Sequence, residues 1–187
     1  MSGQILAEIL SGQVNPSARL SMTFPKSVGQ LPIYYSENST GRPNGKVEAY
    51  HRFASRYLDE QNEPLFPFGY GLSYSEISYH SAKMEDDEIQ ISITNHSEYL
   101  AKEVVQVYVK DQAASIVRPV KELRDFKKIT LAPNETKRVR FKMKQDWFNF
   151  FDANGKECLE DGRFTIYIGK NAADEQLILE IDKKFGK

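Results

Sequence analysis

The chain has 187 residues, of which 40% are apolar and 27% are charged, a composition that allows a folded core and is not that of a disordered segment. The formal net charge of -1 gives no overall field that would attract nucleic acid or an anionic membrane. No apolar run approaches the roughly 20 residues of a membrane span, and the single cysteine, Cys158, excludes an internal disulfide and a multi-cysteine metal site.

The first residues have the pattern of a short helix. Apolar side chains recur four positions apart on one face, as Ile5 with Ile9 and Leu6 with Leu10. Ser2 can cap the start of this helix, and Gly12 can end it in the left-handed conformation. The sequence therefore predicts a helix over residues 3–10.

The next residues predict two short extended pieces and a long loop. Residues 20–25 alternate apolar and polar side chains as a strand does, and Pro25 ends the alternation. Residues 31–35 form a second extended piece. Residues 36–62 are polar, and a loop of this length is usually either functional or disordered. The arginines and aromatic residues within it favour an ordered loop that makes contacts.

Residues 64–74, P-L-F-P-F-G-Y-G-L-S-Y, separate this irregular part from the rest of the chain. Pro64 and Pro67 restrict the backbone to extended geometry, whereas Gly69 and Gly71 permit angles that a β-carbon forbids. A flexible tether would be rich in Gly and Ser, but this stretch is rich in aromatic residues. It is therefore predicted to be a rigid joint packed between two bodies.

After Tyr74 the apolar residues recur at every second position, in about seven runs separated by turn signals. The runs are Ile77 and Tyr79; Ile89, Ile91 and Ile93; Val105, Val107 and Val109; Leu123, Phe126, Ile129 and Leu131; Val139, Phe141 and Met143; Phe164, Ile166 and Ile168; and Leu177, Leu179 and Ile181. The fourth run has a slipped phase, which indicates a bulge or corner. Because no cysteine pair of the antibody kind is present, the pattern predicts a fibronectin type III-like (immunoglobulin-like) antiparallel β-sandwich.

Candidate catalytic and metal-binding residues are few. The acidic clusters are Asp59, Glu60 and Glu63, and the run Glu85, Asp86, Asp87 and Glu88. Sequence neighbours in an extended chain point to opposite faces, so solvated loop charge is the expected role of both clusters. The histidines are His51, His80 and His96, and no two have the spacing of a metal pair. We therefore predict no catalytic residue, no metal site and no cofactor in this chain.

Two clusters have both a structural and a binding interpretation. The basic stripe Lys137, Arg138, Arg140, Lys142 and Lys144 can grip phosphate, but its alternate members would occupy the solvated face of a strand, and the near-zero net charge favours that interpretation. The aromatic cluster Trp147, Phe148, Phe150 and Phe151 could stack on sugars. Core or inter-domain packing is favoured, because large aromatic residues usually supply buried area.

Arg42 is the candidate substrate-binding residue. Gly41 and Pro43 hold the backbone around it in a set shape, and its fork of donors can bind sugar hydroxyls. A salt bridge or a loop anchor is the structural alternative.

Several motifs, in one order along nearly the whole chain, resemble glycoside hydrolase family 3, the β-glucosidase and β-xylosidase family. They are G-Q-V-N-P-S-A-R-L-S-M-T-F-P (12–25), V-G-Q-L-P-I-Y-Y (28–35), T-G-R-P (40–43), S-R-Y-L-D (55–59) and the joint at 64–74. R-P-V-K-E-L-R-D-F-K-K-I (118–129) is similar to the R-P-x-K-E-L-x-G-F block of the family's fibronectin type III-like domain. Ala18, Ser21 and Asp125 depart from the family pattern, which commonly has Gly, Pro and Gly there.

The resemblance implies a layout in which an N-terminal barrel carries the aspartate nucleophile, an α/β sandwich domain carries the acid/base glutamate and the fibronectin-like domain comes last. Residues 1–67 would then be the C-terminal remnant of the α/β domain with its long loop, and residues 68–187 the fibronectin type III-like domain. No S-D-W or K-H-F motif occurs here, so no catalytic residue is carried over. Arg42 becomes a candidate contact to the sugar beyond the scissile bond.

The sequence thus predicts a mainly β chain that is the structural C-terminal portion of a retaining β-glucosidase-like hydrolase and is no enzyme on its own. Its partners would be the missing barrel and α/β domains and, in the parent, a β-glucoside or oligosaccharide, with no nucleic acid and no membrane. An interface left uncovered would favour a homodimer. The lone cysteine and the lack of a signal-peptide pattern favour the cytoplasm over secretion. The alternative is a stand-alone carbohydrate-binding or protein-interaction module.

Overall fold

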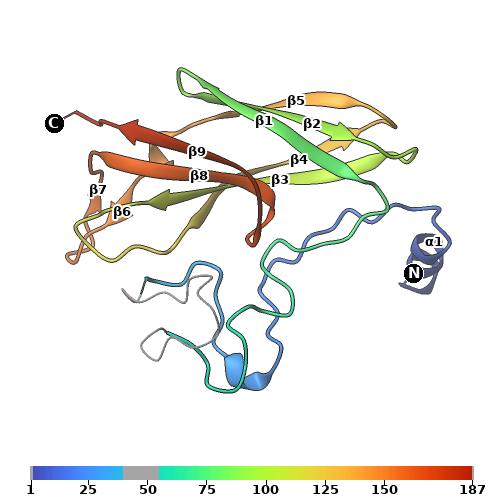
Figure 1. Cartoon of the computed structure of the whole chain (residues 1–187), viewed down its shortest axis with the longest axis horizontal. Coiled ribbons are helices and arrows are strands. Elements are labelled where there is room, and N and C mark those ends of the chain that lie inside the picture. Colours follow the sequence, from blue (N-terminus) through green and yellow to red (C-terminus); the bar gives the residue numbers. More distant parts are fainter. Residues whose placement is uncertain (1, 40–54, 187) are drawn as a thin grey trace.

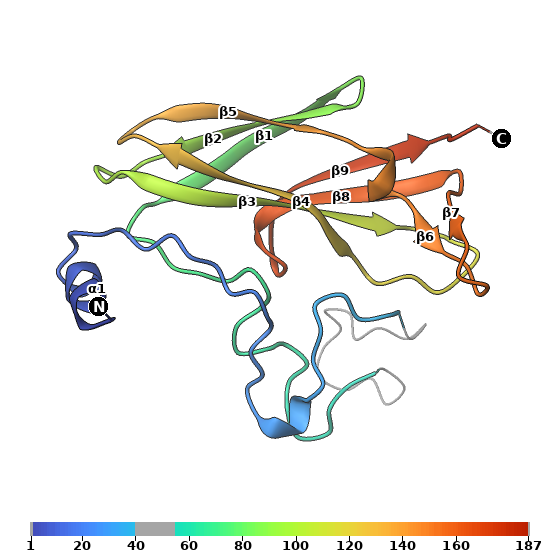
Figure 2. The ribbon, with the colours of Figure 1, turned by 180° about the vertical axis from the view of Figure 1, so that it is seen from behind.

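The computed structural model describes residues 2–39 and 55–186, and within them two antiparallel sheets face each other as a sandwich (Figures 1 and 2). The three-stranded sheet has the order β1-β2-β5, with β1 at Ile77–Glu85, β2 at Glu88–Asn95 and β5 at Thr136–Lys142. The four-stranded sheet has the order β4-β3-β8-β9, with β3 at Ala101–Asp111, β4 at Glu122–Leu131, β8 at Gly162–Asn171 and β9 at Asp174–Lys183. The predicted fibronectin type III-like sandwich is therefore confirmed.

A short additional pair, which the sequence did not predict, lies at the end of the sandwich where β9 ends (Figure 1). It consists of β6 at Phe150–Phe151 and β7 at Glu157–Cys158. Two residues per strand are too few to show a period of two, so the alternation of apolar residues could not indicate these strands.

The core lies between the two sheets because alternate residues of each strand face inward. Ile89, Ile91 and Ile93 of β2 are fully buried, and the register pairs Ile89 with Phe141 and Ile91 with Val139 of β5. Burying one such side chain contributes roughly 1.5–3 kcal/mol relative to leaving it exposed. The core therefore supplies most of the sandwich's stability.

The slipped phase of the fourth apolar run corresponds to a bulge in β4. Val107 of β3 pairs with Asp125 and the next residue, Tyr108, pairs with Leu123, so Arg124 has no residue opposite it. A bulge bends its strand and re-aims one side chain. The predicted irregularity is confirmed, and it places Arg124 in the polar network described below.

Residues 2–39 and 55–75 contain little regular structure. Helix α1 spans Ser2–Leu10 as predicted, and the 3-10 turn η1 spans Val28–Gln30. The strand expected at residues 20–25 is wrong, because the segment makes only one isolated bridge, between Phe24 and Phe66. Proline residues on both sides of this bridge remove the donors that a longer ladder would need. Among the described residues, no helix is long and apolar enough to cross a membrane.

The joint at residues 64–74 runs beside residues 20–24. Leu20 N donates to Tyr70 O at 2.8 Å and Gly69 N donates to Leu20 O at 2.9 Å, while Phe24 N donates to Phe66 O at 2.8 Å. Figures 1 and 2 show these two segments as a pair that leads from the β1 end of the sandwich to the η1 turn. Residues 11–39 and 55–75, to which this pair belongs, are called the strap below. The strap and the sandwich meet over the four-stranded sheet.

Candidate functional site

A buried ion pair links the strap to the sandwich. Arg19 Nη2 donates to Glu103 Oε2 at 2.7 Å, and the Tyr79 hydroxyl donates to Glu103 Oε1 at 3.0 Å. Arg19 also donates from Nη1 to Gly71 O at 2.6 Å. Only 2% of the Glu103 side chain and 12% of the Arg19 side chain are exposed. The guanidinium therefore ties strand β3 to the joint, and the carboxylate that it binds ties β3 to strand β1.

The environment of this ion pair raises the pKa values of Glu103 and Tyr79. Burial raises the pKa of the Glu103 carboxyl, although the charge of Arg19 acts in the opposite direction. Burial, and then the negative charge of Glu103, raise the pKa of Tyr79 above its ordinary range. Tyr79 thus stays a hydroxyl donor at any physiological pH. The arrangement is suited to holding two segments together, and the Nε of Arg19 is buried without a hydrogen-bond acceptor.

Two glycines allow the joint to approach the sandwich closely. Gly69 has a φ of +80°, and a β-carbon there would lie 2.3 Å from the side-chain oxygen of Gln106. A β-carbon on Gly71 would lie 2.4 Å from the carbonyl of Ala18. Both glycines of the joint are therefore required for close contact, and Gly69 is required for its backbone conformation as well.

An aromatic contact continues the attachment along the four-stranded sheet. Tyr35 stacks on Phe68 with ring centroids 4.4 Å apart, and its ring meets Tyr108 of β3 edge-on at 5.8 Å. Gln106, next but one to Tyr108, donates from Nε2 to Lys170 O at 2.7 Å and to Gly69 O at 3.3 Å. The predicted rigid joint is thus packed on one side by polar and aromatic residues of the sandwich.

Gln30 anchors the two ends of the long loop to each other. Its side chain is fully buried and accepts from Lys26 N at 2.6 Å while it donates to Gln61 O at 2.8 Å. The Tyr57 hydroxyl donates to Gln30 O at 2.7 Å. The segments on either side of residues 40–54 are therefore held next to each other.

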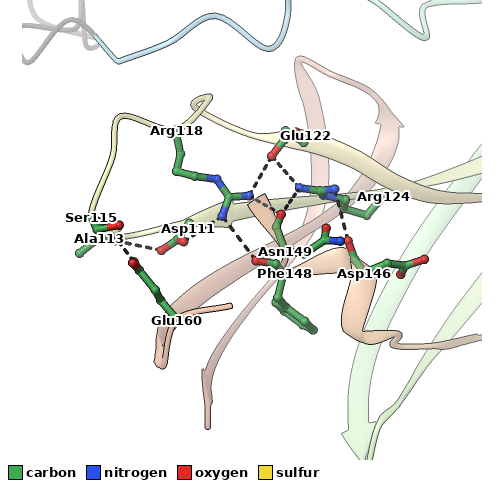
Figure 3. A network of polar contacts seen from close by, with 10 residues as sticks. All are labelled: Asp111, Ala113, Ser115, Arg118, Glu122, Arg124, Asp146, Phe148, Asn149 and Glu160. Carbon is green, nitrogen blue, oxygen red and sulfur yellow. Dashed lines mark hydrogen bonds and ion pairs between the residues drawn. The ribbon is translucent and has the colours of Figure 1, made fainter. Parts of the chain in front are cut away.

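A second polar network lies where the connection between β3 and β4 meets the β6 region (Figure 3). Its centre is Arg118, which donates from Nη1 to Asp111 Oδ2 at 3.2 Å and from Nη2 to Glu122 Oε2 at 3.0 Å. The same guanidinium reaches the carbonyls of Phe148 at 3.5 Å and Asn149 at 3.3 Å. Only 9% of the Arg118 side chain and 3% of the Asp111 side chain are exposed. The network therefore fixes the β3–β4 connection from within.

Arg124, the bulge residue of β4, completes this network. Its Nη2 donates to Glu122 Oε2 at 2.7 Å and to Asn149 O at 3.4 Å, so Glu122 bridges two guanidinium groups (Figure 3). Burial raises the pKa of Asp111, against the opposing effects of the Ala113 N–H and of Arg118. At its centre the cations of Arg118 and Arg124 face the carboxylates of Asp111 and Glu122.

The loop that this network fixes contacts the strap. Val120 N donates to Glu37 O at 2.9 Å, and Asn38 forms a β-bridge with Pro119. Leu123 N, at the start of β4, donates to the Tyr35 hydroxyl at 3.3 Å. The sandwich and residues 35–39 are therefore joined by a short antiparallel bridge, to which the Val120–Glu37 hydrogen bond belongs, and by the contact of Leu123 with the Tyr35 hydroxyl.

The residues singled out in the sequence do not assemble into a catalytic site within the described part of the chain. Arg42 and His51 lie outside the described residues. His80 and His96 have ring centroids 6.0 Å apart, and His80 Nε2 lies 2.7 Å from Thr94 Oγ1. Residues 2–39 and 55–186 hold no group of three or more His, Cys, Asp and Glu residues arranged for a metal ion.

The basic stripe and the aromatic cluster follow the structural interpretations. Arg138, Arg140 and Lys142 are exposed on β5, where Arg140 lies 3.9 Å from Glu88. Trp147 is only 2% exposed and packs in the core with Phe148, whereas Phe151 is 62% exposed. Core packing is therefore confirmed for Trp147 and Phe148, and a stacking platform built on Trp147 is excluded.

Sequence reasoning did not single out Arg19, Glu103 or Arg118. Glu103 occupies an inward position in the run Ala101, Glu103, Val105, and a charged residue at an inward position was the available signal of a buried partner. Arg118 stands in the motif that resembles the family's R-P-x-K-E-L block, but spacing alone does not indicate its acceptors, which include residues 30 and 31 positions away.

The strap and α1 expose many large apolar side chains, in contrast to the closed core of the sandwich. Leu10 of α1 is 74% exposed. The others on residues 2–75 include Ile5, Leu6, Val14, Met22, Val28, Leu31, Tyr34, Leu58, Leu65 and Leu72. Exposed apolar side chains that gather into one patch mark an interaction site. In Figures 1 and 2, α1 stands apart from the sandwich.

Comparisons with known proteins match both parts of the chain. A family model described as Glycosyl hydrolase family 3 C-terminal domain matches residues 1–74, and one described as Fibronectin type III-like domain matches residues 103–172. The periplasmic beta-glucosidase of Salmonella typhimurium is 41% identical over 179 residues, which are 91% of this chain and 23% of that protein. A beta-xylosidase of Formosa agariphila is 38% identical over 94% of this chain and 24% of its own length.

A solved structure agrees with these relatives. The beta-glucosidase from Listeria innocua in complex with glucose is 38% identical and has a TM-score of 0.91, over 96% of this chain and 26% of that one. The chain thus spans about a quarter of the length of the relatives that it matches. With the fold, the motif order and both domain matches in agreement, the chain belongs to glycoside hydrolase family 3, as the counterpart of the C-terminal and fibronectin type III-like domains of the family's longer members.

Proposed function

We propose that this chain is the structural C-terminal portion of a β-glucosidase-type retaining hydrolase and that it holds the other domains of such an enzyme in place. The observation that carries the proposal is the contrast between the closed core of the sandwich and the uncovered apolar side chains of residues 2–75. The other domains would cover this apolar surface. In this proposal the nucleophile and the acid/base are supplied by residues outside these 187.

A supporting part of this kind can affect the rate of a reaction without touching the substrate. Two carboxylates contributed by different domains must keep their separation, and a displacement of about 1 Å can cost a hundredfold in rate. The Arg19–Glu103 pair resists movement of the strap on the sandwich, as do the ring contacts of Tyr35 with Phe68 and with Tyr108. The proposal includes a domain boundary between residues 67 and 68, with residues 1–67 as the C-terminal remnant of the α/β domain and residues 68–187 as the fibronectin type III-like domain.

A nitrophenyl β-glucoside assay tests the proposal. The purified 187-residue chain is expected to release no nitrophenol above the buffer blank, and a longer protein that carries these residues is expected to release it. The Arg19→Met variant of the chain serves as a control for contamination, because a contaminating enzyme is unaffected by it. Hydrolysis by the chain alone, altered by this substitution, would contradict the proposal.

The remaining predictions concern ligand, assembly and compartment. Contact between Arg42 and the sugar beyond the scissile bond stays a prediction, as does a homodimer through the exposed apolar side chains. The cytoplasmic location also stays a prediction, and the Salmonella relative is by name periplasmic. A stand-alone carbohydrate-binding module is not favoured, because Trp147, its intended platform, is buried.

A further inference from the structure

We propose that Arg118 is a positioning residue through which the sandwich sets the place of residues 35–39, the segment that leads into the T-G-R-P motif with Arg42 three positions beyond Ser39. The proposal concerns how the fibronectin type III-like part acts on the strap. Its first half, the position of residues 35–39, rests on contacts of described residues. Its second half, an effect on turnover, rests on the proposed function.

The first step is the number of acceptors around one guanidinium. Arg118 contacts the carboxylates of Asp111 and Glu122 and the carbonyls of Phe148 and Asn149 (Figure 3). Its Cζ also lies 5.0 Å from the centroid of the Phe150 ring. A planar fork held by this many partners has one position, so the backbone of residue 118 is fixed relative to strands β3, β4 and β6.

The second step is the transfer of that position to the strap. Pro119 and Val120 follow Arg118 directly, and these are the residues that pair with Asn38 and Glu37. Glu122, which accepts from Arg118, precedes Leu123, whose N–H donates to the Tyr35 hydroxyl. The Asn38–Pro119 bridge and the Leu123–Tyr35 hydrogen bond therefore both involve loop residues within five positions of Arg118 along the chain.

The third step is that the two arginines of the network are each paired with a carboxylate. Arg118 and Arg124 are balanced by Asp111 and Glu122, and Asp146 contributes its carbonyl to Arg124. Outside the guanidinium groups, Glu160 Oε2 accepts from Ser115 N at 2.9 Å and holds the start of the same loop. Arg124 Nε is buried without an acceptor, whereas the other contacts named here pair the polar groups with one another, which is suited to fixing a loop.

Amide hydrogen exchange on the 187-residue chain tests whether Arg118 fixes the loop that contacts residues 35–39. Arg118→Lys keeps the positive charge but cannot reach the four acceptors. The exchange rate of the Val120 amide, divided by that of the central strand β2, is expected to rise at least tenfold. Arg140→Lys is the matched control, because Arg140 is an exposed arginine on β5, and it should leave this ratio unchanged. An unchanged ratio in Arg118→Lys, or an equal rise in Arg140→Lys, would overturn the proposal.

A milder variant keeps the test usable if Arg118→Lys does not fold. Glu122 is 31% exposed, and Glu122→Gln removes the charge that bridges the two arginines without emptying space. The same selective rise in Val120 exchange is expected, of smaller size. If Arg118→Lys does not fold and Glu122→Gln leaves the ratio unchanged, the positioning role is wrong.

The second half is measured in a longer protein that carries these residues. Arg118→Lys is expected to lower kcat/KM for a β-glucoside at least fivefold, and Arg140→Lys is expected to have no effect. If the longer protein has no glycosidase activity, the proposed function fails while the exchange result stands. If activity is present and Arg118→Lys leaves it unchanged, this inference fails while the proposed function stands.

Discussion

The guanidinium of Arg19 and the carboxylate of Glu103 lie 2.7 Å apart although 84 positions separate them in the chain. The pair joins the strap to strand β3 at a place where almost no water reaches either side chain. A buried pair of this kind is costly to break, because the remaining partner becomes an uncompensated charge. The strap and the sandwich should therefore unfold together.

Arg19→Met tests this coupling. The substitution keeps the apolar stem and leaves the Glu103 carboxylate without its cation, so the free energy of unfolding should fall by about 3 kcal/mol. Urea unfolding followed by the fluorescence of Trp147, the only tryptophan, measures the loss. The double variant Arg19→Met/Glu103→Gln should recover part of it, because the buried charge is gone. A double variant as unstable as the sum of the two single variants would show that the two residues are not coupled.

The pH dependence of stability follows from the raised pKa of Glu103. Between the ordinary pKa of a glutamate and this raised value, the folded chain binds more protons at Glu103 than the unfolded chain does. The contribution of Glu103 to stability therefore rises as the pH falls through the folded-state pKa toward the unfolded value. Measured from neutral pH downward, the free energy of unfolding of the wild type should rise relative to that of Glu103→Gln. A difference between the two proteins that stays constant with pH would contradict the shift.

Gly69 and Gly155 form a matched pair for separating close contact from backbone conformation. Both have a positive φ, +80° and +75°, but only at Gly69 would a β-carbon meet another side chain, that of Gln106. Gly155→Ala should cost about 1 kcal/mol, the penalty of the left-handed conformation. Gly69→Ala should cost roughly 1–3 kcal/mol more, because Gln106 is hydrogen-bonded to two carbonyls and cannot move aside freely. Equal losses in chemical unfolding would mean that Gln106 gives way.

The sandwich was predictable from sequence because the residues that face its core are apolar at every second position, even in β3, which also buries residues of its other face. The bulge at Arg124 was visible for the same reason, as a break in that period. The expected strand at residues 20–25 had the period but lacked a partner strand, and partners are not encoded locally. Ion pairs such as Arg19–Glu103 could not be predicted from sequence, because they join segments whose proximity is set by the whole fold. Arg42, the predicted binding residue, lies outside the described residues.

The exposed apolar face of α1 predicts self-association of the chain. Leu6 is 57% exposed and Leu10 is 74% exposed, and a dimer would cover them. Leu6→Glu/Leu10→Glu should shift the chain toward monomer in sedimentation velocity at micromolar concentration. Ile178→Glu is the control, because Ile178 is a comparably exposed apolar residue on β9 of the sandwich. A wild type that is monomeric throughout, or a control that dissociates equally, would contradict a dimer through α1.

Arg42→Ala, made in a longer protein that carries these residues, tests the predicted contact with the sugar beyond the scissile bond. A nitrophenyl group lacks the hydroxyls of a sugar, so it cannot reproduce the hydrogen bonds that those hydroxyls accept from a guanidinium. The kcat/KM for a β-linked oligosaccharide should therefore fall about tenfold further than that for the nitrophenyl glucoside, a difference of about 1.4 kcal/mol in transition-state stabilisation. Arg138→Ala, on the exposed face of β5, should change neither value. Equal losses on both substrates would assign Arg42 to loop anchoring, because a displaced loop weakens turnover of every substrate alike.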